Sequence, residues 1–367
     1  MGSYIPDLPK LHIETPCIPS PELSRAAGCN IYLKLENLQP SGSFKSRGIG
    51  RLMSESLLSS GTGRAHFYCS SGGNAGLACA EAARALRQPC DVFVPSLAPD
   101  HVLAKLAALG AAAHREGKSW PEADAACRAA LAADPEGVYV PPFDDPLIWA
   151  GNSTLVDELS ALETTTTGFF PESGAVDAIV CSVGGGGLLN GIMEGVERNY
   201  AAAGKRRPAV LAVETDGADS LAECLRFNSY HTKLAMTSIA TSLGAPRVSE
   251  QTYRWTQICR ASVFYPGRHK ASPAGADTNK RLVSAVVSDA DAVSACARFL
   301  DDARLLVEVA CGATLATAYN AETVLRAALA PDADDESWAR MNVVLVVCGG
   351  SSISMEMLAR YREKFGV

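Results

Sequence analysis

The chain has 367 residues, of which 47% are hydrophobic and 20% charged, a composition typical of a globular protein large enough for two lobes. The formal net charge of -7 and the lack of a basic block argue against nucleic acid or an anionic membrane surface as the main partner. We therefore expect the chain to bind a small molecule.

Cysteine usage and the N-terminal residues both indicate a reducing compartment. The twelve cysteines stand singly and never as Cys-x-x-Cys, which favours buried thiols over a disulfide frame or a zinc site. The N-terminus has no cationic segment leading into an apolar core, and no apolar run is long enough to span a bilayer. These patterns predict a cytosolic protein without a transition-metal centre.

Apolar, strand-like runs alternate with helical runs along almost the whole chain. This alternation favours an α/β fold with largely parallel sheets flanked by helices. The proline-rich loop at residues 141–146 interrupts both helix and strand, which suggests a lobe boundary. We predict a small domain at residues 41–146 and a large domain at residues 1–40 and 147–367. The clearest strands are expected at residues 31–36, 66–70, 91–95, 176–183, 210–214 and 341–347, and two of the helices at residues 292–300 and 313–329.

The loop at residues 40–48 delivers one lysine, Lys45, beside the aromatic ring of Phe44 at the start of a helical run. Partial burial of a lysine amine disfavours the ammonium form and frees the lone pair for imine formation, so Lys45 is the predicted nucleophile. A solvated lysine at a helix start is the plainer interpretation of such a residue. The choice between them depends on what the other segments supply.

Four successive glycines, Gly184, Gly185, Gly186 and Gly187, lie between a buried strand and a helix. Unshielded backbone N–H groups and the partial positive charge of a helix N-terminus would hold a phosphate there, although close helix packing alone would also explain the glycines. The Gly-x-Gly-x-x-Gly frame of a dinucleotide site fails at this loop, and the lysine and hydroxyl of a P-loop are missing.

Three further residues follow predicted strands, where α/β folds bind their ligands. Asn74, at a strand-to-helix junction, would donate to a cofactor oxygen or simply cap a helix. Phe143 would lie against an aromatic cofactor or belong to the core. Cys348 would meet a ring nitrogen as a neutral thiol or be an inert buried cysteine.

Taken together, these segments resemble a known family. Residues 41–48, 70–76, 184–188 and 348–351 are similar to the motifs of the pyridoxal-phosphate-dependent serine/threonine dehydratases. Residues 141–146 and Cys348 most resemble the catabolic L-serine dehydratase branch, and the resemblance runs from Leu11 to Arg360. It implies a two-lobed fold of the tryptophan-synthase-β type, a homodimer in the cytoplasm, pyridoxal 5'-phosphate as cofactor, and a role in amino-acid catabolism and gluconeogenesis.

The resemblance also assigns roles to residues. Lys45 would hold the cofactor as a Schiff base and act as the catalytic general base, Asn74 would bond the ring oxygen, and Cys348 would meet the ring nitrogen. The other cofactor-binding residues would be Phe44, Phe143, Gly184, Gly185, Gly186, Gly187, Leu188 and Ser242. The substrate would bind Ser41, Ser43, Ser71, Gly72, Gly73, Asn74 and Ala75. A monovalent cation, for which we expect potassium, would bind Gly184, Glu214, Ala218, Leu243 and Ala245.

Four differences from related enzymes bear on the chemistry and its control. Gly72 stands where related serine racemases place a second acid/base serine, so we do not expect racemisation. Ser242 replaces an expected alanine, and the loop from Pro266 to Asn279 is longer than the family's, which bears on substrate choice and dimer packing. We see no regulatory domain after the catalytic unit and expect no feedback control by isoleucine.

The leading hypothesis is an L-serine and L-threonine ammonia-lyase that gives pyruvate or 2-oxobutanoate. A rival enzyme would catalyse β-replacement or β-elimination on another β-substituted amino acid in a specialised pathway. A rival of a different class would be a pyridoxal-phosphate carrier or regulatory binding protein without turnover.

Overall fold

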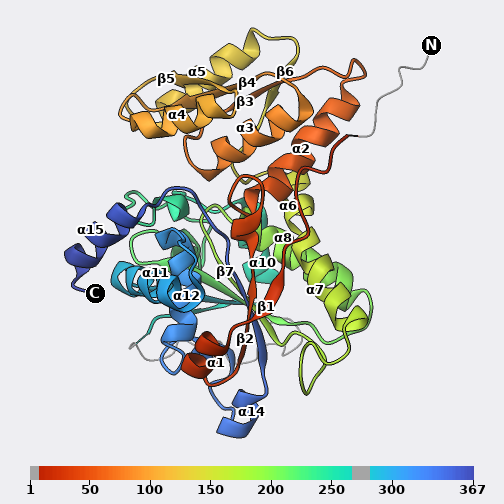
Figure 1. The fold of residues 1–367 in the computed structure, drawn as a ribbon, viewed down its shortest axis with the longest axis vertical. Coiled ribbons are helices and arrows are strands. Elements are labelled where there is room, and N and C mark those ends of the chain that lie inside the picture. Colours follow the sequence, from red (N-terminus) through yellow and green to blue (C-terminus); the bar gives the residue numbers. More distant parts are fainter. Residues whose placement is uncertain (1–7, 267–281) are drawn as a thin grey trace. The chain divides into compact units, whose positions relative to one another are not determined.

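The computed structural model describes residues 8–266 and 282–367, which form two compact units (Figure 1). Of the described residues, 8–13 and 38–152 form the first unit, and 14–37, 153–266 and 282–367 form the second. The predicted loop from Pro266 to Asn279 lies, after Pro266, outside the described residues. The domain bounds expected from the sequence stay a prediction.

The first unit is built on a four-stranded sheet in the order β5-β4-β3-β6, in which all pairs are parallel. Its central strand, β3, places Phe67 and Cys69 on one face and His66 and Tyr68 on the other, because side chains alternate along a strand. The strands are β3 (His66–Cys69), β4 (Cys90–Val94), β5 (Ala112–Arg115) and β6 (Gly137–Tyr139).

Helices cover both faces of this sheet (Figure 1). On one face Phe67 and Cys69 join a large apolar core with residues of α2, α3 and α4, and on the other Tyr68 and Phe93 pack against Cys127 of α5. Helices α2 and α6 approach closely because Gly48 and Gly151 leave room. The helices are α2 (Lys45–Ser59), α3 (Asn74–Leu86), α4 (Asp100–Ala108), α5 (Trp120–Ala132) and α6 (Pro146–Asn152).

The second unit is built on a seven-stranded sheet in the order β1-β2-β11-β7-β8-β10-β9. Only β1 runs antiparallel, and the central strands β7 and β11 are buried along their whole length, as expected for a sheet covered on both faces. The strands are β1 (Cys17–Pro19), β2 (Asn30–Lys34), β7 (Ala178–Ser182), β8 (Ala209–Thr215), β9 (Ser262–Phe264), β10 (Leu282–Val287) and β11 (Asn342–Val346).

Helices α11 and α12 lie on one side of this sheet, and α7 and α8 lie on the other (Figure 1). The α-helices are α1 (Pro21–Ala27), α7 (Thr154–Thr165), α8 (Gly187–Val196), α9 (Ser220–Phe227), α10 (Glu250–Ile258), α11 (Asp289–Ala303), α12 (Val309–Tyr319), α13 (Leu325–Leu329), α14 (Asp335–Ala339) and α15 (Met355–Phe365). Short turns η1 (Glu36–Leu38), η2 (Glu197–Ala201) and η3 (Thr241–Leu243) complete the unit. Among the described residues, none of the helices is long and apolar enough to cross a bilayer.

The structure confirms the predicted α/β class and the parallel sheets, with one difference in the helices. The run expected at residues 313–329 is broken at Asn320, where the backbone leaves the helical conformation and α12 ends. All twelve cysteines are buried and free, as the sequence predicts.

Candidate active site

Lys45 is the first residue of α2 in the first unit, and its side chain is half-buried. Its Nζ donates a hydrogen bond to the Pro142 carbonyl oxygen at 2.6 Å and lies 5.2 Å from the centre of the Phe44 ring. The structure therefore brings the predicted nucleophile beside the loop that carries Phe143. That loop is held by Trp149, whose Nε1 donates to the Phe143 carbonyl oxygen at 2.9 Å.

The loop before Lys45 is ordered by serine hydroxyls. Ser46 Oγ donates to Ser41 Oγ at 2.8 Å and accepts the Ser41 N–H at 3.1 Å. Ser43 is 1% exposed, and its Oγ has no hydrogen-bond partner among the described residues. Buried hydroxyls are nearly always paired, so Ser43 Oγ is a natural contact for a ligand atom.

The loop after β3 holds the predicted substrate contacts Ser71, Gly72, Gly73, Asn74 and Ala75. Gly73 is the cap residue of α3 and Asn74 is its first helical residue, so the asparagine side chain does not cap the helix. Asn74 is 7% exposed and Ala75 is 2% exposed. Ser71 Oγ accepts the Gly73 N–H at 3.3 Å. The positive end of α3 thus faces this loop.

The glycine loop of the second unit joins β7 to α8. Gly186 has a φ of 95°, and a Cβ atom there would lie 1.9 Å from Thr252 Oγ1, so only glycine fits. The helix begins at Gly187, and the first N–H groups of a helix have no acceptor within it. Leu188 is buried in the first turn. The loop therefore presents backbone donors at the positive end of α8, as a phosphate site requires.

A buried polar network supports this loop. Thr252 Oγ1 donates to Asn190 Oδ1 at 2.8 Å, and Asn190 Nδ2 donates to Ser249 Oγ at 2.9 Å. The Ser249 N–H in turn donates to the Gly185 carbonyl oxygen at 2.8 Å. None of these three polar residues was among the predicted ones. A single amide, Asn190, in the apolar run of α8 is the sequence signal that could have indicated the network.

The turn η3 lies against the glycine loop. A Cβ atom on Gly184 would lie 3.0 Å from Leu243 Cα and 3.1 Å from the Ser242 carbonyl oxygen. Ser242 is exposed in the second unit, and Ser220 Oγ donates to the Ala245 carbonyl oxygen at 2.6 Å. Residues predicted to bind the phosphate and residues predicted to bind the cation are therefore adjacent in the second unit.

Glu214, near the end of β8, is fully buried, and its carboxylate faces the start of α9. Its Oε1 accepts the Leu221 N–H at 2.7 Å and its Oε2 accepts the Ala222 N–H at 2.8 Å. Burial raises the pKa of Glu214 to about 8, and these two N–H bonds oppose the rise only in part. Ala218 is buried close by, with its N–H donated to the Thr215 carbonyl oxygen at 2.8 Å.

Cys348 follows β11 and Ser182 ends the neighbouring strand β7. The two side chains are in contact, with 3.4 Å between Ser182 Oγ and Cys348 Sγ. Cys311, on α12, is fully buried; burial, together with a hydrogen bond to Cys348, raises the pKa of its thiol well above the ordinary value. Cys348 therefore stands at the carboxyl edge of the sheet beside a hydroxyl and a neutral thiol.

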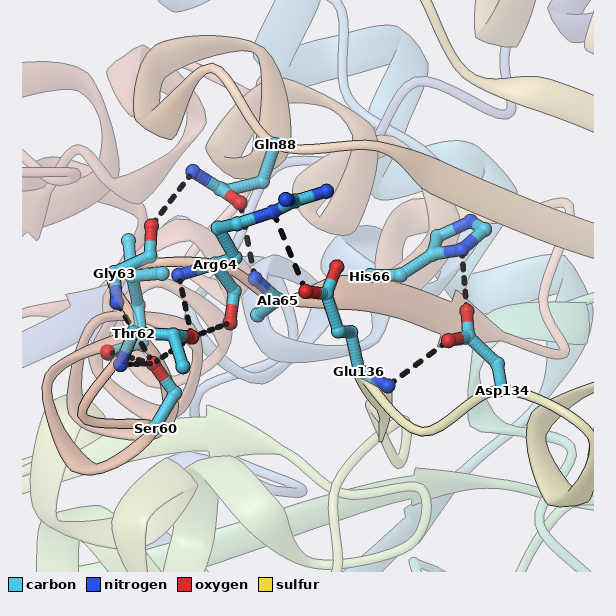
Figure 2. A network of polar contacts seen from close by, with 10 residues as sticks. Ser60, Thr62, Gly63, Arg64, Ala65, His66, Gln88, Asp134 and Glu136 are labelled. Carbon is cyan, nitrogen blue, oxygen red and sulfur yellow. Dashed lines mark hydrogen bonds and ion pairs between the residues drawn. The ribbon is translucent and has the colours of Figure 1, made fainter.

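One hollow of the first unit lies elsewhere. This cavity of about 380 Å³ is at the amino ends of β3 and β6, and none of the predicted site residues lines it. Figure 2 shows its rim, where Arg64 pairs with Glu136 at 3.3 Å. Nearby, the His66 ring contacts Asp134 at 2.7 Å. The predicted residues follow the carboxyl ends of the same strands, where parallel sheets bind their ligands.

Residues 8–349 match the family model described as pyridoxal-phosphate dependent enzyme. The chain belongs to this family. It is 38% identical over 364 residues to the L-serine dehydratase/L-threonine deaminase of Bos taurus, with 97% of each chain covered. The crystal structure of a fungal L-serine ammonia-lyase from Rhizomucor miehei matches it with a TM-score of 0.80 at 31% identity, covering 97% of this chain and 99% of the other.

A second solved structure, the processed form of threonine deaminase isoform 2 from Solanum lycopersicum, matches with a TM-score of 0.74 at 22% identity, covering 97% of this chain and 84% of the other. At that identity the likeness concerns the fold alone. The predicted tryptophan-synthase-β-like fold is confirmed.

The residues present fit the cofactor of the pyridoxal-phosphate dependent enzymes. The glycine loop has no room for a Cβ atom at Gly186. It lies at the N-terminus of α8, where the positive end of the helix stabilises a phosphate. The half-buried Lys45 supplies an amine for the cofactor aldehyde, and the unpaired Ser43 Oγ nearby in the chain supplies a polar contact.

Proposed function

We propose that this pyridoxal-phosphate dependent enzyme is an L-serine and L-threonine ammonia-lyase, which gives pyruvate or 2-oxobutanoate and ammonia. The observation that carries the proposal is the 38% identity to an L-serine dehydratase/L-threonine deaminase over 97% of both chains. The fungal L-serine ammonia-lyase supports it at the level of the fold, with a TM-score of 0.80.

Bound pyridoxal phosphate would supply the electron sink that makes the α-proton of an amino acid acidic and lets the β-hydroxyl leave. Lys45 Nζ would hold the cofactor aldehyde and then take the α-proton as general base, after giving up its hydrogen bond to the Pro142 carbonyl oxygen. Glycine residues 184–187 and the Leu188 N–H would hold the phosphate.

The other predicted residues would orient the ring and the substrate. Asn74 would donate to the ring oxygen, and Phe143 and Ser242 would pack on the ring faces. Cys348, a thiol beside Ser182 Oγ, would meet the ring nitrogen without offering it a fixed negative charge. The N–H groups of residues 71–75 at the positive end of α3 would receive the substrate carboxylate.

We also propose a potassium ion bound by Glu214 and by backbone carbonyl oxygens of Gly184, Ala218, Leu243 and Ala245. Carboxylate and carbonyl oxygens are the ligands that hard cations prefer. The contact of Gly184 with Leu243 and the burial of Glu214 support it. Thermal unfolding in potassium and in tetramethylammonium salts tests the site: the proposal requires a higher Tm in potassium.

The family resemblance further supports a cytoplasmic homodimer that serves amino-acid catabolism and gluconeogenesis. Light scattering of the purified protein tests the dimer, and a monomer would overturn it. Fractionation of cells that express the protein tests the compartment.

The reaction is tested by product analysis with L-serine and L-threonine, with and without an added thiol. The proposal requires ammonia and the 2-oxo acid in equal amounts without the thiol. A product formed only with the thiol would instead indicate β-replacement, and cofactor binding with no product would indicate a carrier protein.

A further inference from the structure

Ser70, the first residue after β3, is 1% exposed and is held by hydrogen bonds within the first unit. Its Oγ donates to Asp124 Oδ1 on α5 at 2.6 Å, and its carbonyl oxygen accepts the Trp120 Nε1–H at 2.7 Å. Tyr139 at the end of β6 donates its hydroxyl to the same Asp124 Oδ1 at 2.6 Å. Both the side chain and the backbone of Ser70 are therefore held.

Asp124 is the centre of this group. Its second oxygen, Oδ2, accepts the Arg128 Nε–H at 2.8 Å, and the Arg128 guanidinium lies 4.1 Å from the centre of the Tyr139 ring. Burial alone would raise the pKa of Asp124, but the hydrogen bonds from Ser70, Tyr139 and Arg128 outweigh it and the pKa lies below the ordinary value. The carboxylate is thus ionised, with both oxygens engaged.

Because Ser70 is held in place, the residues that follow it are also restricted in position. The Ser71 carbonyl oxygen packs so closely on Gly76 that a Cβ atom there would lie 1.7 Å away. Ser71 Oγ accepts the Gly73 N–H at 3.3 Å, and α3 starts at the next residue. Two glycines in this short loop would otherwise give it many conformations, and ordering them costs free energy. An anchor at Ser70 reduces that cost before the substrate binds.

Trp120 and Asp124 contribute to holding the loop after β3 and not to the apolar packing of α5 on the sheet. The Trp120 ring is 47% exposed, so its burial contributes little, yet its one donor reaches the Ser70 carbonyl oxygen. The apolar contact between α5 and the sheet is made instead by Cys127 with Tyr68 and Phe93. The polar residues of α5 therefore meet the sheet at the loop, one turn away from the apolar contact.

We propose that Asp124, supported by Trp120 and Tyr139, is a positioning residue that fixes the loop of residues 70–74 for the substrate carboxylate. The inference rests on the proposed function, since it names what the loop receives. When a loop is binding-competent for only part of the time, the apparent affinity falls by that fraction. Loss of the anchor should therefore weaken substrate binding and leave the chemical step in place.

The variants that test this are Asp124→Asn and Trp120→Phe, with Asp100→Asn as the matched control. Asp100 is also in the first unit and pairs with Arg115, but its side chain is 95% exposed. Trp120→Phe keeps an aromatic ring and removes only the donor, so it serves if Asp124→Asn does not fold. We expect KM for L-serine to rise about fivefold in both variants, with kcat within about twofold of wild type.

Two readouts do not depend on turnover. L-Alanine carries the amine and carboxylate but has no leaving group, so its dissociation constant, measured by calorimetry on the holoenzyme, should rise by the same factor as KM. Hydrogen exchange of the peptide covering residues 70–76 should be faster in the variants, while that of α2 is unchanged. The Asp100→Asn protein should match wild type in every measurement.

An unchanged KM and L-alanine affinity in folded Asp124→Asn or Trp120→Phe protein would overturn the inference, even with faster exchange. A lower kcat at unchanged KM would overturn it as well, because a positioning role for the carboxylate predicts the reverse. If wild type binds L-alanine but makes no 2-oxo acid from serine, the proposed function fails, and the L-alanine and exchange measurements still decide the role of Asp124.

Discussion

Lys45 and Pro142 are joined by a hydrogen bond of 2.6 Å between the lysine Nζ and the proline carbonyl oxygen. The two residues are 97 positions apart in the chain and belong to the same unit. The bond holds the amine against the loop that carries Phe143, so the proposed nucleophile and a proposed ring contact are positioned together. It also shows which hydrogen bond the amine must release before it reacts.

Replacing Lys45 with alanine removes the only group proposed to bind the cofactor covalently. We expect Lys45→Ala to lose the visible absorption of lysine-bound cofactor and to lose activity by about 10³-fold or more. Absorption spectra, and borohydride reduction followed by mass spectrometry of the peptides, measure the attachment of the cofactor, and an assay of the 2-oxo acid measures the activity. Lys10→Ala, an exposed lysine of the same unit, is the control and should keep both properties. Cofactor still attached by reduction in Lys45→Ala would show that another residue holds it.

Gly186→Ala should destabilise the second unit. At a φ of 95° an alanine is strained, and its Cβ would lie 1.9 Å from Thr252 Oγ1, within the network of Asn190 and Ser249. Strain and a broken buried hydrogen bond should together lower the free energy of unfolding by about 2–4 kcal/mol and weaken cofactor binding. Urea unfolding and cofactor titration measure the two effects.

Gly204→Ala is the control that separates the backbone strain of Gly186→Ala from its contact with Thr252. Gly204 also has a positive φ, 68°, but nothing lies within 4 Å of its would-be Cβ. It should therefore show only the backbone cost, about 1 kcal/mol, and normal cofactor affinity. Equal losses in the two variants would mean that the contact with Thr252 plays no part.

Local patterns predicted those parts of the molecule that depend on neighbouring residues. The apolar run at residues 176–183 became β7, and the glycines that follow it became the turn into α8, because strand periodicity and glycine conformations are local properties. The same holds for Lys45 at the start of α2. The break at Asn320 was missed because an alanine-rich stretch favours a helix on either side of it.

Contacts between distant segments could not be predicted in this way. Asn190 meets Ser249 and Thr252 across 59 and 62 positions, and Ser182 meets Cys348 across 166. Such pairs depend on strand order and helix packing, which no single segment encodes. The group around Asp124 was missed for the same reason, since Ser70 lies 54 positions before it.

The buried Glu214 predicts a dependence of stability on pH in buffer free of potassium and sodium. Its pKa is about 8 in the folded protein, against 4.5 as the ordinary value, so the folded state binds more protons between these two values. The free energy of unfolding should therefore be highest below pH 4.5 as far as this group is concerned, and should fall as pH rises towards 8. Urea midpoints at about pH 5.5 and about pH 8.5 measure the slope.

Glu214→Gln should remove this part of the slope, because an amide does not titrate. It should also lower stability at every pH by about 1–3 kcal/mol, since one amide hydrogen would face the Leu221 or Ala222 N–H. Glu322→Gln, with a side chain that is 75% exposed, should keep the wild-type slope. A slope that is the same in Glu214→Gln and wild type would show that Glu214 does not titrate in this range.

Cys348→Ala tests the proposed partner of the ring nitrogen. Cys348 Sγ lies 3.4 Å from Ser182 Oγ and is hydrogen-bonded to Cys311, so its loss removes two polar contacts at this edge of the sheet. We expect normal cofactor content, a kcat lower by about tenfold and a shifted pH profile of kcat, measured by steady-state kinetics. Cys29→Ala, which removes another buried thiol of the second unit, should leave the profile unchanged. If Cys348→Ala shares the wild-type rate and pH profile, the thiol does not contact the reacting ring, and the nitrogen must be met by another group.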